Sequence, residues 1–477
     1  MRAFIALFFV LILSTLACGS GNINTPAISN SPTKEAAVTQ AASDPASETV
    51  TPAASSPTEE PVTPTATPSP ANVIFVDTLE QEVYPFIQNG KCSLAEAIMA
   101  ANTARQFDSC NIGVLGESVI ELMPGEYVFT QADQSPPVYE WLISVTDVGT
   151  ALPPIAYPMT IHGNGAVLTR DENAEPFRFF ELMINSTLTM NNITVQNGDV
   201  ADDWGGAIYS MSASITLDNT RFINNHSDNG GAIYFNLGRI DITNSEFVSN
   251  KSTNNGGALF IDSSRSSIQS TRFEGNESDG NGGGLYAHFA TIVIRDGFFI
   301  KNRVTGNDNG LWGGGMYTNH VNITITESQF YQNVSPGYGG AVGIVNPILA
   351  GIDPETENLL EQVQDSPFVS DMFTSIPGFQ ATLEAHPSGV YVDFTEDIQI
   401  HNNCFANNAT LNSTEPNWTS GIHASAAFAD GNYWGHPSGP SGRGPGTGDS
   451  VGKTNVTFSP FLTEAPAFCD PSLTEIQ

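Results

Sequence analysis

The stretch HSDNGGAIYF at residues 226–235 contains a five-residue motif, GGAIY, that returns along the chain with small changes. The copies are GGAIY at 205–209 and 230–234, GGALF at 256–260, GGGLY at 282–286, GGGMY at 313–317 and GGAVG at 339–343. Successive copies begin 25, 26, 26, 31 and 26 residues apart. Such an even period indicates a repeat architecture, which decides the fold before any local propensity does.

A second motif runs in step with the first: an Ile or Leu is followed five residues later by Phe, and three residues after that by Asn. The Phe residues are Phe222, Phe247, Phe273, Phe299, Phe330 and Phe405, and the Asn residues are Asn225, Asn250, Asn276, Asn302, Asn333 and Asn408. Each repeat is short, rich in β-branched residues and interrupted by Gly, Asn and Asp, so we expect two or three short strands per repeat.

A coil of about 25 residues without a helix cannot bury its apolar face alone, but stacked coils can. The repeats therefore predict an all-β fold, a single-stranded right-handed parallel β-helix in which Phe stacks on Phe and Asn bonds to Asn about 4.8 Å apart. The Gly pairs suit tight bends. Ser93 and Glu96 form a capping-box pattern, which predicts an amphipathic helix over residues 93–105 that covers the first coil.

The chain divides into segments of different composition. Residues 1–18 have one basic residue, a short apolar run and then small residues before Cys18, as in an export signal. Residues 19–72 are rich in Thr, Pro and Ser and predict a disordered stalk. The β-helix is expected over 73–469, with a cap at 73–130, a mostly loop insertion at 344–395, and a tail at 470–477.

Charge and cysteines limit the partners and the compartment. The net charge is −34, with 16 basic against 50 acidic residues, which excludes binding to nucleic acid phosphates and docking on anionic lipid. Besides Cys18, the chain has four cysteines that can form two disulfides in an oxidising compartment: Cys92, Cys110, Cys404 and Cys469. Three pairings are open, of which pairing between sequence neighbours is the simplest.

Several motifs resemble known families. STLAC at 14–18 resembles a bacterial lipobox, which implies acylation of Cys18; the alternative is a plain secretory signal. NGKCSLAEAIMAAN at 89–102, NYWGHPSGP at 432–440, GTGDSV at 446–451 and FSPFL at 458–462 resemble segments of the CSLREA-type β-helix proteins. The repeats are also similar to those of the polymorphic outer membrane protein family. These resemblances imply a pectin-lyase-like right-handed β-helix, a fold that hosts many functions.

Two sets of residues are candidates for a binding site. If Ile208 and Ser210 point inward, strand alternation places Tyr209 and its equivalents outward, as a stripe for stacking against sugars. The alternative is an internal aromatic ladder that only packs. The turns before the Gly pairs supply further aromatic and acidic side chains, which predict a carbohydrate groove with Ca²⁺ as a candidate cofactor. Its residues are Trp204, Trp312, Tyr338, Asp203, Asp228 and Asp308. The alternative is ordinary solvated turns.

One pair of residues suits catalysis. Asp262 and His288 fall at equivalent positions one coil apart, so they are expected to be neighbours and could act as an acid and a base. A polysaccharide lyase would also need basic residues clustered against a uronate carboxylate, and the sequence shows no such cluster. Chance pairs are common where every position repeats.

Together these features predict a monomeric, lipid-anchored protein on the extracellular face of a bacterial cell envelope. Its predicted role is binding or adhesion, with extracellular glycan as the expected ligand and another surface protein as the alternative partner. A polysaccharide lyase or glycoside hydrolase is the rival function, and a structural spacer is the third. Membrane contact is expected through the lipid anchor only.

Overall fold

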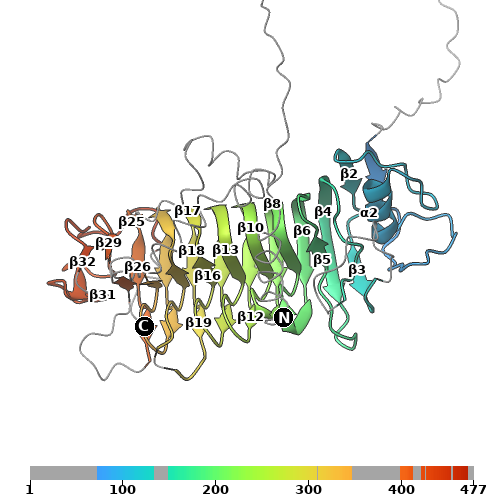
Figure 1. Ribbon diagram of the computed structural model, residues 1–477. Helices are drawn as coiled ribbons and strands as arrows, with labels where there is room; N and C mark the ends of the chain where they lie inside the picture. Colours follow the sequence, from blue (N-terminus) through green and yellow to red (C-terminus); the bar gives the residue numbers. More distant parts are fainter. Residues whose placement is uncertain are drawn as a thin grey trace, which may run out of the picture. The chain divides into compact units, whose positions relative to one another are not determined.

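The computed structural model describes residues 72–133, 149–308, 310–345, 398–411, 421–424, 426–452 and 455–470. The export signal with Cys18, the stalk up to residue 71 and most of the predicted insertion at 344–395 therefore lie outside the described residues. The described residues form a right-handed parallel β-helix of about nine coils (Figure 1), which confirms the predicted fold class. Successive coils pair in register along the chain.

Strand β8 (Ile208–Ile223) shows how one coil is built. It runs through three faces of the coil, and it bends at Ser212 and Asn219, where the backbone adopts left-handed φ values of 59° and 51°. After a further turn, β9 (His226–Asn229) adds a fourth short segment. The coil thus has four pairing segments rather than the two or three expected, because single left-handed residues bend the strand without ending its pairing with the next coil.

Equivalent segments stack into four columns of strands. The first column comprises β5 (Phe180–Leu182), the starts of β8, β10 (Ile233–Thr243) and β13 (Leu259–Gln269), then β16 (Leu285–His288), β20 (Met316–Asn319), β24 (Val342–Val345), β28 (Ile422–Ala424) and β31 (Gly448–Gly452). The second comprises β2 (Ser118–Glu121), β4 (Met159–Arg170), β6 (Thr187–Gln196), the middle of β8, the later parts of β10 and β13, then β17 (Thr291–Arg295), β21 (Asn322–Thr326), β25 (Ile398–His401), β29 (Ala426–Phe428) and β32 (Asn455–Thr457).

The two remaining columns close each coil. The third contains β3 (Glu126–Phe129), the later parts of β4, β6 and β8, and then β11 (Glu246–Val248), β14 (Arg272–Glu274), β18 (Phe298–Ile300), β22 (Gln329–Tyr331) and β26 (Cys404–Ala406). The fourth is the separate seven-stranded sheet of β7 (Asp199–Trp204), β9, β12 (Lys251–Ser252), β15 (Glu277–Ser278), β19 (Arg303–Val304), β23 (Val334–Ser335) and β27 (Ala409–Thr410). The short β30 (Pro440–Gly442) pairs with β31.

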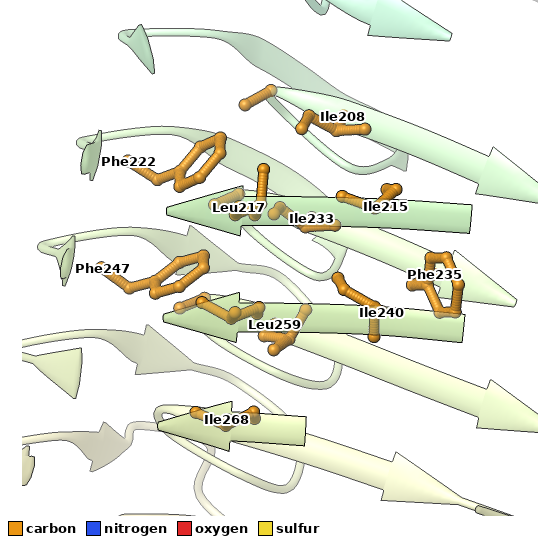
Figure 2. Packing of buried hydrophobic residues seen from close by; sticks show 14 of the residues in the cluster. Ile208, Ile215, Leu217, Phe222, Ile233, Phe235, Ile240, Phe247, Leu259 and Ile268 are labelled. Atoms are coloured by element: carbon orange, nitrogen blue, oxygen red, sulfur yellow. The ribbon is translucent and has the colours of Figure 1, made fainter. Parts of the chain in front are cut away.

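The interior of the coils is filled by stacked apolar side chains. Figure 2 shows Phe222 and Phe247 in line with one another, with Ile and Leu side chains from neighbouring coils beside them. The six Phe residues of the repeat form an inner Phe column whose neighbouring ring centroids are 4.8–5.1 Å apart, and every ring is fully buried. The predicted position of these rings is therefore confirmed.

An inner Asn ladder, made of the six Asn residues of the repeat, lies next to the Phe column. Asn250 is typical: its side-chain amide donates to the backbone oxygen of Phe222 (2.9 Å) and to Oδ1 of Asn276 (3.0 Å). Its own Oδ1 accepts hydrogen bonds from the backbone and the side chain of Asn225. Such buried amides are stable only because each donor and acceptor is paired. The last member, Asn408, donates to Asp449 in β31 instead of another Asn.

The Gly pairs are required by the close approach of neighbouring coils. Gly230 has a left-handed φ of 64°, which glycine adopts without strain. At Gly231 a Cβ atom would collide with the backbone oxygen of Gly257 in the next coil. The Gly pair thus allows each coil to bend between the fourth and first columns while the neighbouring coils stay one strand spacing apart.

Both ends of the described solenoid carry a disulfide. Helix α2 (Leu94–Thr103) begins with the predicted capping box of Ser93 and Glu96 and contacts β1 (Val73–Phe75) and β2. Cys92 and Cys110 bracket this helix and are joined to one another. Cys404 is joined to Cys469, so both disulfides connect sequence neighbours. Close to the second disulfide, Trp434 stacks on Phe405 and continues the inner Phe column.

Candidate functional site

The outer face of the first column carries a continuous row of aromatic rings, which we call the aromatic stripe. Its members are Tyr209, Tyr234, Phe260, Tyr286 and Tyr317, which are in register from coil to coil. Neighbouring ring centroids are 4.7–5.6 Å apart and the rings are stacked. None of the five belongs to the hydrophobic core cluster, as alternation predicts. Because the ring faces contact one another, however, the stripe presents ring edges rather than faces to a ligand.

Tryptophans cover the two ends of the stripe and leave its centre open. Trp204 stacks on Tyr234 (4.8 Å between centroids), and Trp312 contacts Tyr317 edge-on (6.4 Å). Accordingly, Tyr209, Tyr234 and Tyr317 are 1–8% exposed, whereas Phe260 and Tyr286 are partly exposed. We refer to the exposed parts of Phe260 and Tyr286 as the open centre of the stripe.

The position of Trp312 depends on a glycine in the next coil. Gly343 stands where the other coils have a stripe aromatic, and a Cβ atom there would lie 2.9 Å from the Cβ of Trp312. Trp312 also packs against Tyr338 (4.9 Å) and edge-on against His423 (4.7 Å). The structure thus brings Trp312 and Tyr338 together. Trp204 is four coils away, which is about 19 Å at the strand spacing.

Between the two tryptophans the turn before each Gly pair carries asparagine. The backbone amide of Asn281 donates to Oδ1 of Asn255 (2.9 Å), and that of Trp312 donates to Oδ1 of Asn281 (2.8 Å). We call Asn229, Asn255 and Asn281 the outer Asn ladder. Asparagine is too short to cover the stripe, so Phe260 and Tyr286, whose turns carry Asn255 and Asn281, stay accessible, whereas Tyr234 is covered by Trp204 from the preceding coil.

The predicted acidic residues of these turns have local roles. Asp203 forms an ion pair with Arg178 (2.7 Å), whose guanidinium is fully buried and lies over the ring of Tyr209. Asp228 accepts hydrogen bonds from Asn229 and Thr253. Asp308 accepts from the backbone amide of Gly310 within its own turn. Among the described residues, no group of three or more His, Cys, Asp or Glu is placed to hold a metal ion.

The predicted neighbours Asp262 and His288 do lie together on the outer face, beside the open centre. Oδ1 of Asp262 is 3.4 Å from Nδ1 of His288, and both side chains are partly exposed. Asn236 lies on the other side of Asp262, at 3.4 Å. Burial and the neighbouring Asp262 raise the pKa of Tyr286 to about 12, so its hydroxyl stays protonated and can donate a hydrogen bond.

Sequence reasoning missed a second group of residues, which follows Asp262 and His288 at the end of the first column. Phe289 and His320 occupy the corner between the first and second columns, and their rings stack at 4.7 Å. The signal in the sequence is slight: Phe289 and His320 replace the Ser that stands at this corner in two other coils, Ser212 and Ser263.

The repeat is the part of the chain for which a comparison gives a match. Residues 219–236 and 270–288 match the model of the Chlamydia polymorphic membrane protein repeat. Both segments lie in the central coils, and each includes a residue of the inner Asn ladder and one of the stripe. No curated protein and no solved structure gives a match. The repeat and the β-solenoid together indicate a protein of the cell surface or outer membrane.

The described residues contain no helix with the length and apolar content needed to cross a bilayer. The lipobox-like residues around Cys18 lie outside the described part, as do the stalk residues that would follow it. Resemblance to the CSLREA-type proteins rests on the sequence motifs alone. In the structure one of these motifs, NYWG, supplies Trp434 to the inner Phe column.

Proposed function

We propose that this chain is a lipid-anchored surface protein that binds extracellular glycan along the outer face of its first strand column. The observation that supports the proposal is the open centre of the aromatic stripe, where Phe260 and Tyr286 stay partly exposed between Trp204 and Trp312. The stripe rings repeat at the same spacing from coil to coil. Such a regular row of aromatic side chains suits a polymeric ligand, whose units also repeat at a regular spacing.

Polar groups on both sides of the open centre suit a ligand with many hydroxyls. The outer Asn ladder lies on one side, and Asp262 and His288 lie on the other. Carbohydrate sites commonly combine apolar ring contacts with a few placed hydrogen-bonding groups. The pronounced negative charge of the chain favours uncharged or hydroxyl-rich ligands over polyanions.

The test is retention of the full chain on an array of bacterial and plant glycans. Trp312→Ala should abolish retention, because Trp312 borders the open centre and its loss removes one wall of the proposed groove. Val293→Ala is the matched control, since Val293 is exposed on the second column, away from the aromatic stripe. If no glycan is retained by the unmodified protein, the structural-spacer reading replaces this one.

Anchoring through lipid is tested separately, because Cys18 and the solenoid are far apart in sequence. Cys18→Ser should release the protein from the membrane fraction while its circular dichroism spectrum and melting temperature stay unchanged. A Cys18→Ser protein that remains on membranes would show that Cys18 does not carry the anchor.

Polysaccharide cleavage is a second candidate, supported by the contact between Asp262 and His288. Under this reading, Asp262→Asn and His288→Ala should eliminate product formation, measured as new reducing ends or unsaturated uronates, while Trp312→Ala mainly raises KM. Under the binding proposal neither Asp262→Asn nor His288→Ala creates or removes any product, and glycan is recovered intact.

A further inference from the structure

The corner between the first and second columns carries one exposed aromatic ring whose position is unusual. The residue at this corner has a left-handed backbone in five successive coils: Ser212, Leu237, Ser263, Phe289 and His320, with φ of 45–59°. A bulky side chain is rarely found in that conformation. Phe289 is nevertheless 42% exposed, so burial in the core does not account for its presence.

Part of the Phe289 ring is exposed. The ring stacks on His320, with 4.7 Å between centroids, and His288 is tilted against it at 4.0 Å. In the preceding coil the corner residue is Ser263, which has no ring to stack on Phe289. Phe289 therefore differs from the members of the aromatic stripe, whose faces are occupied by one another.

Two buried side-chain atoms at and next to this corner have no hydrogen-bond partner. Oδ1 of Asn319 and Nδ1 of His320 are both buried and receive no hydrogen bond. Burial and the nearby His288 lower the pKa of His320, which favours the neutral imidazole, and one of its ring nitrogens can then accept a hydrogen bond from a ligand. An unpaired buried polar group is costly, so turning these side chains outward towards a ligand that donates hydrogen bonds would remove the cost.

We propose that Asp262, His288, Phe289, Asn319 and His320, which we call the corner cluster, bind one uncharged sugar unit of the glycan. The apolar face of the sugar lies on Phe289, and its hydroxyls donate to Asn319 and His320 once these two side chains have turned outward. Asp262 adds a further acceptor and repels a carboxylate or sulfate, so the cluster selects neutral sugars over uronates. This inference rests on the proposed glycan binding and names the class of sugar.

The charges around the cluster are consistent with this selection. Asp262 and His288 contact one another, and Asn236 contacts Asp262 from the preceding coil. Arg265, the cation nearest in sequence, is exposed at the start of the second-column segment, and no ion pair is formed between it and Asp262 in the described part of the chain. A uronate would need a paired cation in the cluster itself.

Calorimetric titration of the full chain with neutral glucan oligosaccharides and with oligogalacturonate of equal length tests the inference. The neutral oligosaccharide should bind at least tenfold more tightly. Phe289→Asn, which suits a left-handed backbone, and Asn319→Leu should each weaken neutral binding about tenfold. Val293→Ala, at a site equally exposed in the same coil, should leave binding unchanged, and melting temperatures verify that each variant is folded.

The outcomes separate this inference from the proposed function. Equal or tighter binding of oligogalacturonate overturns the selection for neutral sugars. Neutral binding that survives Phe289→Asn but is lost in Tyr286→Leu overturns the corner cluster and leaves glycan binding at the open centre intact. Absence of binding by any glycan to the unmodified protein overturns both.

Discussion

The inner Phe column and the outer aromatic stripe are two ladders of the same kind in different surroundings. Both repeat once per coil, and both stack their rings about 5 Å apart. Every ring of the inner column is fully buried, whereas exposure along the stripe rises from its ends to Phe260 and Tyr286. Stacking alone therefore does not decide whether a ladder only packs in the core or can also contact a ligand. That depends on whether other residues cover the rings.

The same contrast applies to asparagine. Asn276 of the inner ladder is fully buried; its Oδ1 accepts two hydrogen bonds, and its backbone and side-chain amides donate three. Asn281 of the outer ladder is partly exposed and has water as an alternative partner. The inner columns thus hold the coils together, and the outer columns are free to vary, as the change from Asn to Trp at Trp204 and Trp312 illustrates.

The largest effect is expected from Phe273→Ala, which interrupts the inner Phe column. Loss of a buried ring between Phe247 and Phe299 leaves a cavity and should lower the free energy of unfolding by about 3–5 kcal/mol. Urea titration followed by circular dichroism measures the change. An unchanged midpoint would contradict the assignment of this column to the core.

The second prediction concerns Asp449, the carboxyl group at the end of the inner Asn ladder. Burial raises its pKa from 3.8 to about 7, against the opposing hydrogen bonds from Asn408. The folded state therefore holds the proton more tightly than the unfolded state, and stability falls as pH rises from about 4 to 7. Three pKa units correspond to at most about 4 kcal/mol.

Asp449→Asn extends the ladder with a neutral acceptor and should remove this pH dependence. The variant is expected to unfold at a higher temperature than the unmodified protein at pH 8 and at a similar temperature at pH 4. Thermal scans at both pH values measure the difference in melting temperature between the variant and the unmodified protein. Other carboxylates contribute equally to both proteins, so their contributions cancel in this difference. A constant difference between the proteins across this range would show that Asp449 is already ionised in the fold.

The third prediction compares the two Asn ladders directly. Asn276→Ala leaves the backbone and side-chain donors of Asn250 without their acceptor in a buried setting, and should cost about 1–3 kcal/mol. Asn281→Ala removes the acceptor of Trp312 where water can replace it, so the loss should be smaller. Chemical denaturation measures the free energy of unfolding of both variants. Equal decreases for Asn276→Ala and Asn281→Ala would contradict the distinction between the inner and outer ladders.

The smallest effect on stability is expected from Tyr286→Leu at the open centre of the stripe. It keeps an apolar side chain but removes the stacking on Phe260 and Tyr317, at about 0.5–1.5 kcal/mol. Phe273→Leu is the matched change in the inner column and should cost more. Glycan retention should fall in Tyr286→Leu and persist in Phe273→Leu at temperatures where both are folded.

The sequence was sufficient to predict the columns because the repeat itself carries them. Each coil presents the same residues at the same spacing, so stacking and the inward position of Phe273 and Asn276 follow from the period. The capping box at Ser93 and the proximity of Asp262 to His288 follow from equally local rules. Alternation left two positions open for the stripe, on the outer face or inside, and the structure places its residues outside the core cluster.

The parts that could not be predicted depend on residues that break the period. The side chain of Trp312 can take its orientation because the following coil has Gly343. Asp203 pairs with Arg178, which lies in a coil outside the regular repeats. Phe289 and His320 acquire their relation only through the left-handed corner backbone. The orientation of a side chain at such a position depends on a single neighbouring residue in another coil. The repeat pattern of the sequence does not predict that neighbour.

The inner Asn ladder also gives the solenoid a direction of assembly. The backbone and side chain of each Asn donate to the oxygen of the Asn in the following coil, as from Asn250 to Asn276 and from Asn276 to Asn302. A partly built solenoid therefore ends in donors that only another complete coil, or a terminator such as Asp449, can satisfy. Coils of this design can be duplicated or deleted as whole units between the two disulfide-bearing ends, so the length of the protein can change in evolution in steps of one repeat.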